Sequence, residues 1–226
     1  PGAGKSTITN QLTKYFLSDN KKVGIIAVDP TSPFTGGALL GDRVRMTDIG
    51  TNDNVFIRSM ATRGSLGGLS KKAVDAADVL DAAGFDIIIF ETVGVGQSEL
   101  DIAQTADTTI VVLVPESGDS VQAMKAGLME IADFFVLNKS DRPGAHQAFT
   151  ALQTILLIKD RDENSWRPDI IKTIASENTG IEEIAKEIER HKLYMKDKNL
   201  FIVKRENQAK TRIKERLFEK CNLHTI

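Results

Sequence analysis

The first seven residues, Pro1-Gly-Ala-Gly-Lys-Ser-Thr7, have the residue types and the spacing needed to hold the phosphates of a nucleotide. Gly4, Lys5 and Ser6 match the last three fixed positions of the phosphate-binding loop, G-x-x-x-x-G-K-[ST], whose first glycine would lie two residues before Pro1. In this loop the glycines let backbone N–H groups surround the phosphates, the lysine reaches the β- and γ-phosphates, and the hydroxyl binds Mg²⁺. A glycine-rich turn before an ordinary helix is the alternative. We expect a phosphate site made of Gly2, Ala3, Gly4, Lys5, Ser6 and Thr7.

Two carboxylates follow apolar runs and so occupy places where they can serve the metal ion of a bound nucleotide. Asp29 follows residues 23–28, and Glu91 follows residues 85–90. Runs of this kind are typical of buried parallel strands, whose carboxyl ends form the ligand-binding edge of an open α/β sheet. Glu91 is therefore similar to a Walker-B acid, which orients the Mg²⁺ shell. For Asp29 the alternative role is a cap or a turn.

Loops rich in glycine and hydroxyl residues supply further candidates. Residues 31–46 contain Asp42 and Arg43, which could bring a carboxylate to the metal shell and a guanidinium to phosphate. The loop after Glu91 contains Gln97, a candidate for positioning the attacking water, although a plain surface role competes for both loops. The predicted catalytic residues are Lys5, Asp29, Asp42 and Glu91, and the predicted Mg²⁺ ligands are Ser6, Asp29, Asp42 and Glu91.

A base-recognition element, Asn138-Lys-Ser-Asp141, follows the apolar run 133–137. The carboxylate of Asp141 can accept the ring N–H and the exocyclic amine of guanine, whereas adenine would place an acceptor against it. Asn138 is expected to tie the binding loops together, and the stem of Lys139 to lie over the base. The tetrapeptide is a weak signal alone, but its position after a strand and after a phosphate-binding loop is the order that GTP-binding domains require. These residues therefore predict a guanine nucleotide.

Alternating apolar runs and amphipathic segments predict the elements that position these residues. Strands are expected at residues 23–28, 55–59, 85–90, 109–114, 133–137 and 168–174, and helices at residues 6–19, 70–83, 121–130, 144–158 and 181–191. A buried parallel strand is also expected ahead of Pro1, because a phosphate-binding loop follows such a strand. Ala175 and Ser176 follow the last strand, where a backbone N–H could meet the guanine carbonyl. The pattern predicts an α/β fold of the P-loop NTPase kind, a mostly parallel sheet with helices on both faces.

The composition changes near residue 199. Residues 204–220 hold seven basic and three acidic side chains, with a thin apolar stripe formed by Ile202, Ala209, Ile213 and Leu217. We expect a P-loop nucleotide-binding domain over residues 1–198 and a C-terminal helical extension over residues 199–226. A projecting helix that pairs with another chain and a solvated terminal helix are both compatible with the stripe.

The overall composition argues against several classes of partner. The chain of 226 residues has 29 basic and 31 acidic side chains and a formal net charge of −2, so no basic surface for nucleic acid is expected. The longest apolar runs, such as residues 109–115, have the length of a strand, so no membrane span is expected. Cys221 is the only cysteine, which rules out a disulfide within the chain and is compatible with a reducing compartment.

Three stretches together resemble the MeaB/ArgK family of P-loop GTPases: residues 28–46, residues 90–99 and residues 138–141. The resemblance covers nearly the whole chain. It implies a GTPase that acts as a chaperone for adenosylcobalamin-dependent methylmalonyl-CoA mutase, assisting cofactor loading and protecting the mutase from inactivation. GTP or GDP and Mg²⁺ are the implied ligands. The resemblance assigns Lys5, Ser6, Asp29, Asp42 and Glu91 to the phosphates and Mg²⁺, and Asn138, Lys139 and Asp141 to guanine.

The resemblance also carries expectations about assembly and location. Residues 115–125 match an additional switch of the family, in which Lys125 would communicate with the mutase. The full-length protein is expected to be a homodimer, with the dimerisation arm cut short near Ile226. The expected location is the cytoplasm, or the mitochondrial matrix in a eukaryote.

Two other classes of protein stay open. A nickel-insertion GTPase of the urease or hydrogenase maturation kind has a similar architecture but should carry a cluster of Cys and His ligands. Here these residues are scattered along the chain, at His146, His191, Cys221 and His224. A transport-linked ATPase or kinase, of the arginine/ornithine type, would need a phosphate-acceptor pocket that the sequence does not reveal.

Overall fold

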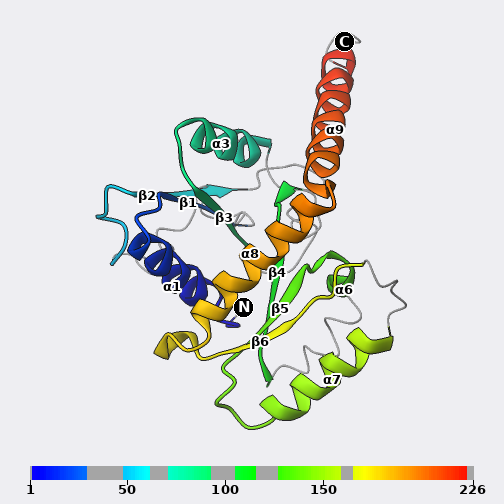
Figure 1. The fold of residues 1–226 in the computed structure, drawn as a ribbon. Helices are drawn as coiled ribbons and strands as arrows, with labels where there is room; N and C mark the ends of the chain where they lie inside the picture. Colours follow the sequence, from blue (N-terminus) through cyan, green and yellow to red (C-terminus); the bar gives the residue numbers. More distant parts are fainter. Residues whose placement is uncertain are drawn as a thin grey trace.

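Parallel strands and covering helices make up the part of the chain that the computed structural model describes, residues 2–29, 48–61, 71–92, 105–115, 127–158 and 165–222 (Figure 1). The strands are β1 (Val23–Asp29), β2 (Val55–Ala61), β3 (Ile87–Thr92), β4 (Ile110–Leu113), β5 (Phe134–Asn138) and β6 (Ile170–Thr173). The helices are α1 (Lys5–Ser18), α3 (Lys71–Ala82), α6 (Leu128–Ile131), α7 (Ala145–Ile158), the short 3-10 helix η2 (Ala175–Glu177), α8 (Ile181–Asp197) and α9 (Leu200–Asn222). The loops predicted at residues 31–46 and after Glu91, and most of the helix predicted at 121–130, lie outside the described residues.

Every strand pairing among the described residues is parallel. The strand order is β2-β1-β3 in one sheet and β4-β5-β6 in the other. In the first sheet Asp29 pairs with Ala61, and Ala27 pairs with Glu91, so the backbones of Asp29 and Glu91 reach the same edge. The predicted parallel sheet is confirmed, and its carboxyl edge carries both strand-end acids.

Apolar side chains point alternately to the two faces of the central strands, which explains why helices cover both faces of the sheet. In β1, Val23 and Ile25 lie in a core shared with α1 and α8, whereas Ile26 and Val28 lie in a core shared with α3. β5 alternates in the same way, between the first core and a core with α7. The first core contains residues of every described strand, so the two sheets form one layer, with α1 and α8 on one face and α3 and α7 on the other (Figure 1). This is the predicted helix–sheet–helix arrangement.

A large cavity separates the facing edges of β3 and β4. It has a volume of about 1810 Å³ and is lined by residues 87–92, by residues 105–110, and by Ile8 and Leu12 of α1. Along these edges β3 and β4 pair with no strand of the described part of the chain. Two parallel edges with apolar walls are what one more buried strand needs, which supports the expectation of a strand ahead of Pro1. The strand itself stays a prediction.

Several element boundaries differ from the predicted ones, and two of these differences have a physical reason in the packing. β3 begins at Ile87 rather than at residue 85, and Phe85 instead makes an edge-to-face contact with Phe56. β3 also ends later than predicted, at Thr92, so Glu91 lies inside the strand and not just beyond it. α8 continues past residue 191 to Asp197, because Met195 is buried and the chain turns only at Asn199, whose φ of 54° is left-handed.

α9 projects from the body of the molecule (Figure 1), and the contacts of its side chains give it two different faces. On the docked face Arg205 pairs with Asp107 at 2.7 Å, and Arg212 pairs with Asp78 at 2.5 Å. The hydrogen bond to Asp78 raises the pKa of Arg212. Three residues of the predicted apolar stripe are each more than half exposed: Ile202, Ile213 and Leu217. A helix therefore lies where the extension is predicted, while its role as a separate domain or a pairing surface stays a prediction. No helix in the described ranges is both long and apolar enough to cross a membrane.

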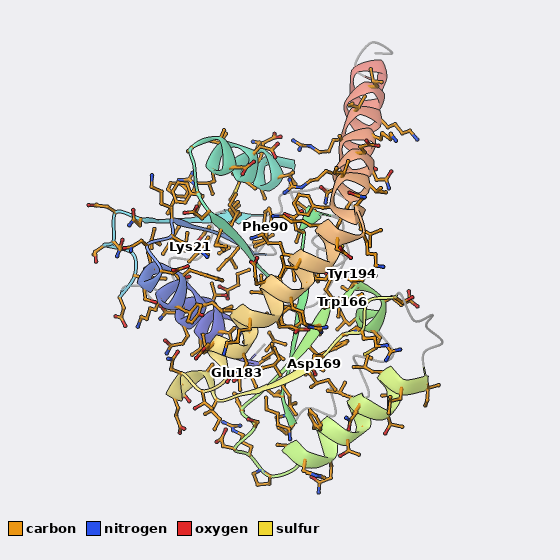
Figure 2. All side chains as sticks on the ribbon, viewed as in Figure 1. Lys21, Phe90, Trp166, Asp169, Glu183 and Tyr194 are labelled. Atoms are coloured by element: carbon orange, nitrogen blue, oxygen red, sulfur yellow. The ribbon has the colours of Figure 1, made fainter. Side chains whose placement is uncertain are left out.

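A buried polar network holds α8 against the amino ends of β4 and β5, the edge opposite Glu91. His191 is 2% exposed, with Nδ1 lying 2.8 Å from Oγ1 of Thr108 and Nε2 lying 3.3 Å from Oδ1 of Asp133. Trp166 donates from Nε1 to the carbonyl of Asp133 and packs against His191 and Tyr194 (Figure 2). Because each nitrogen of His191 has a protein partner, this histidine is a structural anchor for α8.

Candidate functional site

The phosphate-binding segment forms a turn that opens directly into α1. Gly2 and Gly4 have φ values of 84° and 83°, a left-handed conformation that glycine adopts without strain. α1 then begins at Lys5, and the N–H of Ile8 donates to the carbonyl of Gly4 at 3.0 Å. The N–H groups that precede Ile8 at the start of α1 have no intrahelical acceptor, and together with the positive end of the helix dipole they suit an anion.

Ser6 and Glu91 come together although they are 85 residues apart in the sequence. The Ser6 hydroxyl donates a hydrogen bond to Oε1 of Glu91, which is only 5% exposed. Mg²⁺ prefers hard oxygen donors, and it usually takes one or two protein ligands and completes its shell with phosphate oxygens and waters. The pair therefore fits the predicted ion. Among the described residues, no group of three or more His, Cys, Asp or Glu could hold a metal ion without such help.

The other predicted metal-binding and catalytic residues are placed less fully. Asp29 ends β1 on the same edge as Glu91. Lys5 borders the cavity between β3 and β4 together with Glu91. Asp42, Arg43, Gln97 and Lys125 lie outside the described residues, so their roles stay predictions.

Asn138, the last residue of β5, connects the phosphate-binding turn to the segment after β6. Its side chain is 3% exposed, and its Nδ2 donates to the carbonyl of Ala3 at 2.9 Å. Its Oδ1 accepts hydrogen bonds from the hydroxyl of Thr173 at 3.0 Å and from the N–H of Ala175 at 3.1 Å. One buried amide thus uses both its donor and its acceptor to hold two loops, so the two ends of the site have a fixed relative position.

The turn after Asn138 presents Lys139 and Asp141. Lys139 has a left-handed φ of 56°, a conformation that costs a residue other than glycine about 1 kcal/mol and is often found at functional sites. Ser140 offsets this strain, because its N–H and its hydroxyl both donate to the carbonyl of Thr173 at 3.0 Å. Asp141 is exposed at a pocket of about 260 Å³. The pocket is lined by Gly4, Thr7, Asn138, Lys139, Asp141, Arg142, Ile174, Ala175 and Ser176, so residues predicted from three separate segments surround one space.

The predicted donor to the guanine carbonyl is a backbone N–H of Ala175 or Ser176, and the hydrogen bonds distinguish these two residues. The N–H of Ala175 already donates to Asn138, so the N–H of Ser176, which borders the same pocket, is the better placed donor for a base carbonyl. The sequence reasoning also missed Thr173, which holds Asn138, and Gln11, whose Nε2 donates to the carbonyl of Ala175 at 3.3 Å. A threonine at the end of the strand that leads to Ala175 is a signal that could have identified Thr173. Nothing in the sequence marks Gln11.

Gly4→Ala is expected to weaken nucleotide binding about tenfold or more. An added Cβ would lie 2.3 Å from Nδ2 of Asn138 and would displace the amide from both loops, besides straining a φ of 83°. A calorimetric titration with GDP measures the loss. Gly84→Ala is the matched control, because Gly84 has a φ of 80° and open space around the added carbon, at the end of α3. An equal loss in both variants would contradict the role given to Asn138.

Comparison with known proteins points to one family. The family profile described as "Methylmalonyl Co-A mutase-associated GTPase MeaB" matches residues 1–225. A protein of Pyrococcus horikoshii is 52% identical over 216 residues, which cover 95% of this chain and 68% of that protein. GTPase ArgK of Escherichia coli is 41% identical over 189 residues, covering 81% and 56% of the two chains. The mitochondrial methylmalonic aciduria type A homolog of Mus musculus is 38% identical over 188 residues, which cover 81% of this chain and 45% of that protein.

Solved structures agree with the fold. The crystal structure of a LAO/AO transport system kinase matches with a TM-score of 0.77 at 29% identity, covering 99% of this chain and 67% of that one. HypB from Helicobacter pylori in complex with nickel matches with a TM-score of 0.57 at 20% identity, covering 88% of this chain and 84% of that one. The second likeness concerns the fold alone. The chain spans about two thirds of the length of the Pyrococcus protein and of the transport system kinase, and a smaller share of ArgK and the mouse protein.

Proposed function

This chain belongs to the MeaB family of methylmalonyl-CoA mutase-associated GTPases, and we propose that it binds Mg²⁺·GTP between Ser6 and Asp141 and assists a cobalamin-dependent mutase. It is a GTPase with the P-loop fold. The observation that carries the proposed site is the position of Asn138, whose amide holds both the carbonyl of Ala3 and the N–H of Ala175. The phosphate segment and the base segment therefore belong to one nucleotide site.

Each segment has a separate task in this site. The N–H groups at the start of α1 and the ammonium group of Lys5 bind the phosphates. Ser6 and Glu91 would hold Mg²⁺, which when bound neutralises the charge that develops on the phosphate oxygens during hydrolysis. Asp141 accepts the N–H and the amine of guanine, while Lys139 covers the base plane.

The proposed task is to assist adenosylcobalamin loading of methylmalonyl-CoA mutase and to protect the mutase from inactivation. The family description, which links the family to this mutase, and the name of the mouse relative support it. We further propose a homodimer of the full-length protein, for which the exposed stripe of α9 offers a surface. The proposed location is the cytoplasm, or the mitochondrial matrix in a eukaryote, as the name of the mouse relative suggests.

The two competing classes have less support. Nickel insertion rests on a shared fold at 20% identity, and the part of the chain that the structure describes has no cluster of His and Cys ligands. The alternative of a transport-linked kinase is supported by the similar fold of the solved LAO/AO transport system kinase. The pocket is lined by Lys139 and Asp141, however, which we propose to bind guanine, and this supports a GTPase over an enzyme that uses ATP.

GTP hydrolysis by the full-length protein alone is expected to be slow, and the mutase is expected to accelerate it about tenfold or more. The reason is that the phosphate-binding motif itself contains no arginine, and Gln97 is only a weak candidate for positioning water. Phosphate release is measured with and without purified adenosylcobalamin-dependent methylmalonyl-CoA mutase, and serum albumin serves as the control protein. Fast turnover of the protein alone would contradict the first expectation, and an unchanged rate with the mutase would contradict the proposed partnership.

A further inference from the structure

Gln11 makes a second connection between the phosphate-binding helix and the base-recognition segment. Its Nε2 donates to the carbonyl of Ala175 at 3.3 Å, and the side chain is half-buried between α1 and η2. The N–H of Asn178 donates to the same carbonyl at 3.3 Å, within the turn itself. Because Asn138 holds the N–H of Ala175, both backbone polar groups of Ala175 are held by side chains from other segments.

The two connections reach α1 and its leading turn at different points. Asn138 holds Ala3, just ahead of α1, whereas Gln11 lies eight residues later, about 12 Å further along the chain at the rise of a helix. Asn138 holds the N–H of Ala175 and does not contact its carbonyl, whose direction is set by Gln11 and by the turn itself. This second contact, at a separate point along α1, also sets the orientation of the segment after β6.

We propose that Gln11 is a positioning residue for guanine recognition, holding the carbonyl of Ala175 so that the N–H of Ser176 faces the carbonyl oxygen of the base. The proposal rests on the proposed guanine-nucleotide site. A bound base bonds to the turn through that one oxygen, so a small rotation of the turn weakens the bond without closing the pocket. The contribution of Gln11 should therefore depend on the acceptor at position 6 of the purine.

The test compares GDP with 6-thio-GDP, in which a sulfur atom, a poor hydrogen-bond acceptor, replaces the oxygen at position 6. In the full-length protein, Gln11→Leu keeps the size of the side chain but removes its donor. The dissociation constant for GDP should rise about fivefold, while the constant for 6-thio-GDP should change less than about twofold. Gln11→Lys, which restores a donor, should recover most of the affinity for GDP.

Lys14→Leu is the matched control, because Lys14 lies one turn further along α1 and pairs with Asp48 instead of the base segment. It should leave both dissociation constants unchanged. Equal weakening of GDP and 6-thio-GDP by Gln11→Leu would reduce Gln11 to a general structural residue, and no change with either ligand would also overturn the proposal. If the unaltered protein bound ADP as tightly as GDP, the guanine site itself would fail, and this outcome is separate from a failure of Gln11 alone.

Discussion

Glu91→Gln is expected to lower the single-turnover rate of GTP hydrolysis by about two to three orders of magnitude, while GDP affinity changes less than about threefold. Glu91 is buried and accepts the hydrogen bond of Ser6, so it sits where a carboxylate can orient Mg²⁺. A glutamine can still accept that bond, which preserves the local packing, but it lacks the negative charge. The phosphate-binding turn and Asp141 are untouched, so the GDP complex should survive.

The magnesium dependence of the same variant gives a second readout. The backbones of Asp29 and Glu91 reach the same sheet edge, and we expect their carboxylates to repel each other unless a cation lies between them. Removing one charge should raise the Mg²⁺ concentration needed for half-maximal activity. Nucleotide-dependent assistance of the mutase should be lost together with hydrolysis, because loops that sense the γ-phosphate do so through the metal ion.

Glu187→Gln is the matched control for the loss of a buried carboxylate. Glu187 is 6% exposed, but it lies on α8 and binds the guanidinium of Arg190, and the hydrogen bond raises the pKa of Arg190. The control should lower the thermal midpoint and leave the rate of hydrolysis unchanged. If Glu91→Gln retains both hydrolysis and mutase assistance, Glu91 is a structural strand residue and the metal site has been assigned wrongly.

The order of the elements could be predicted because the central strands are buried on both faces. β1 and β5 alternate between two apolar cores and therefore read as continuous apolar runs, a pattern specific to parallel sheets covered by helices. The residues at their carboxyl ends, such as Asn138, could then be assigned to one edge without knowledge of any distance. The predicted family rests on residues 28–46, 90–99 and 138–141, and it is confirmed by the profile match over residues 1–225.

The contacts that orient the base segment could not be predicted, because they depend on side chains that have no pattern of their own. Gln11 reads as an ordinary polar residue of an amphipathic helix, and only the packing of α1 against η2 brings it to Ala175. The use of the Ala175 N–H by Asn138 is a further case, since sequence order gives the neighbourhood of a donor but not its acceptor. The two-residue shift of β3 has the same origin: Phe85 is apolar enough for a strand, but it packs against Phe56 outside the ladder.

Asp141→Asn is expected to weaken GTP binding by about a hundredfold and to strengthen binding of xanthosine triphosphate, reversing the preference between the two nucleotides. In the proposed site the carboxylate of Asp141 accepts two hydrogen bonds from guanine, and an amide in its place would turn a donor toward the exocyclic amine. Xanthine carries a carbonyl at that position, so the amide can accept the ring N–H and donate to the carbonyl. Asp141 lies at the pocket formed with Lys139 and Ala175, where we propose that guanine binds. Dissociation constants for both triphosphates, measured by calorimetry on the full-length protein, give the ratio.

The matched control for Asp141→Asn is Asp169→Asn, the same change at an exposed aspartate that precedes β6 at the opposite edge of the sheet. Asp169 accepts a hydrogen bond from the N–H of Ile170, so its replacement can affect stability slightly but has no route to the base. In the control, the ratio of the dissociation constants for GTP and xanthosine triphosphate should therefore stay at the value of the unaltered protein. A ratio that stays unchanged in Asp141→Asn as well would show that this carboxylate does not face the base, and the guanine pocket would have to be reassigned. A loss of affinity for both nucleotides by the same factor would instead mean that Asp141 supports the turn after Asn138 and does not read the purine.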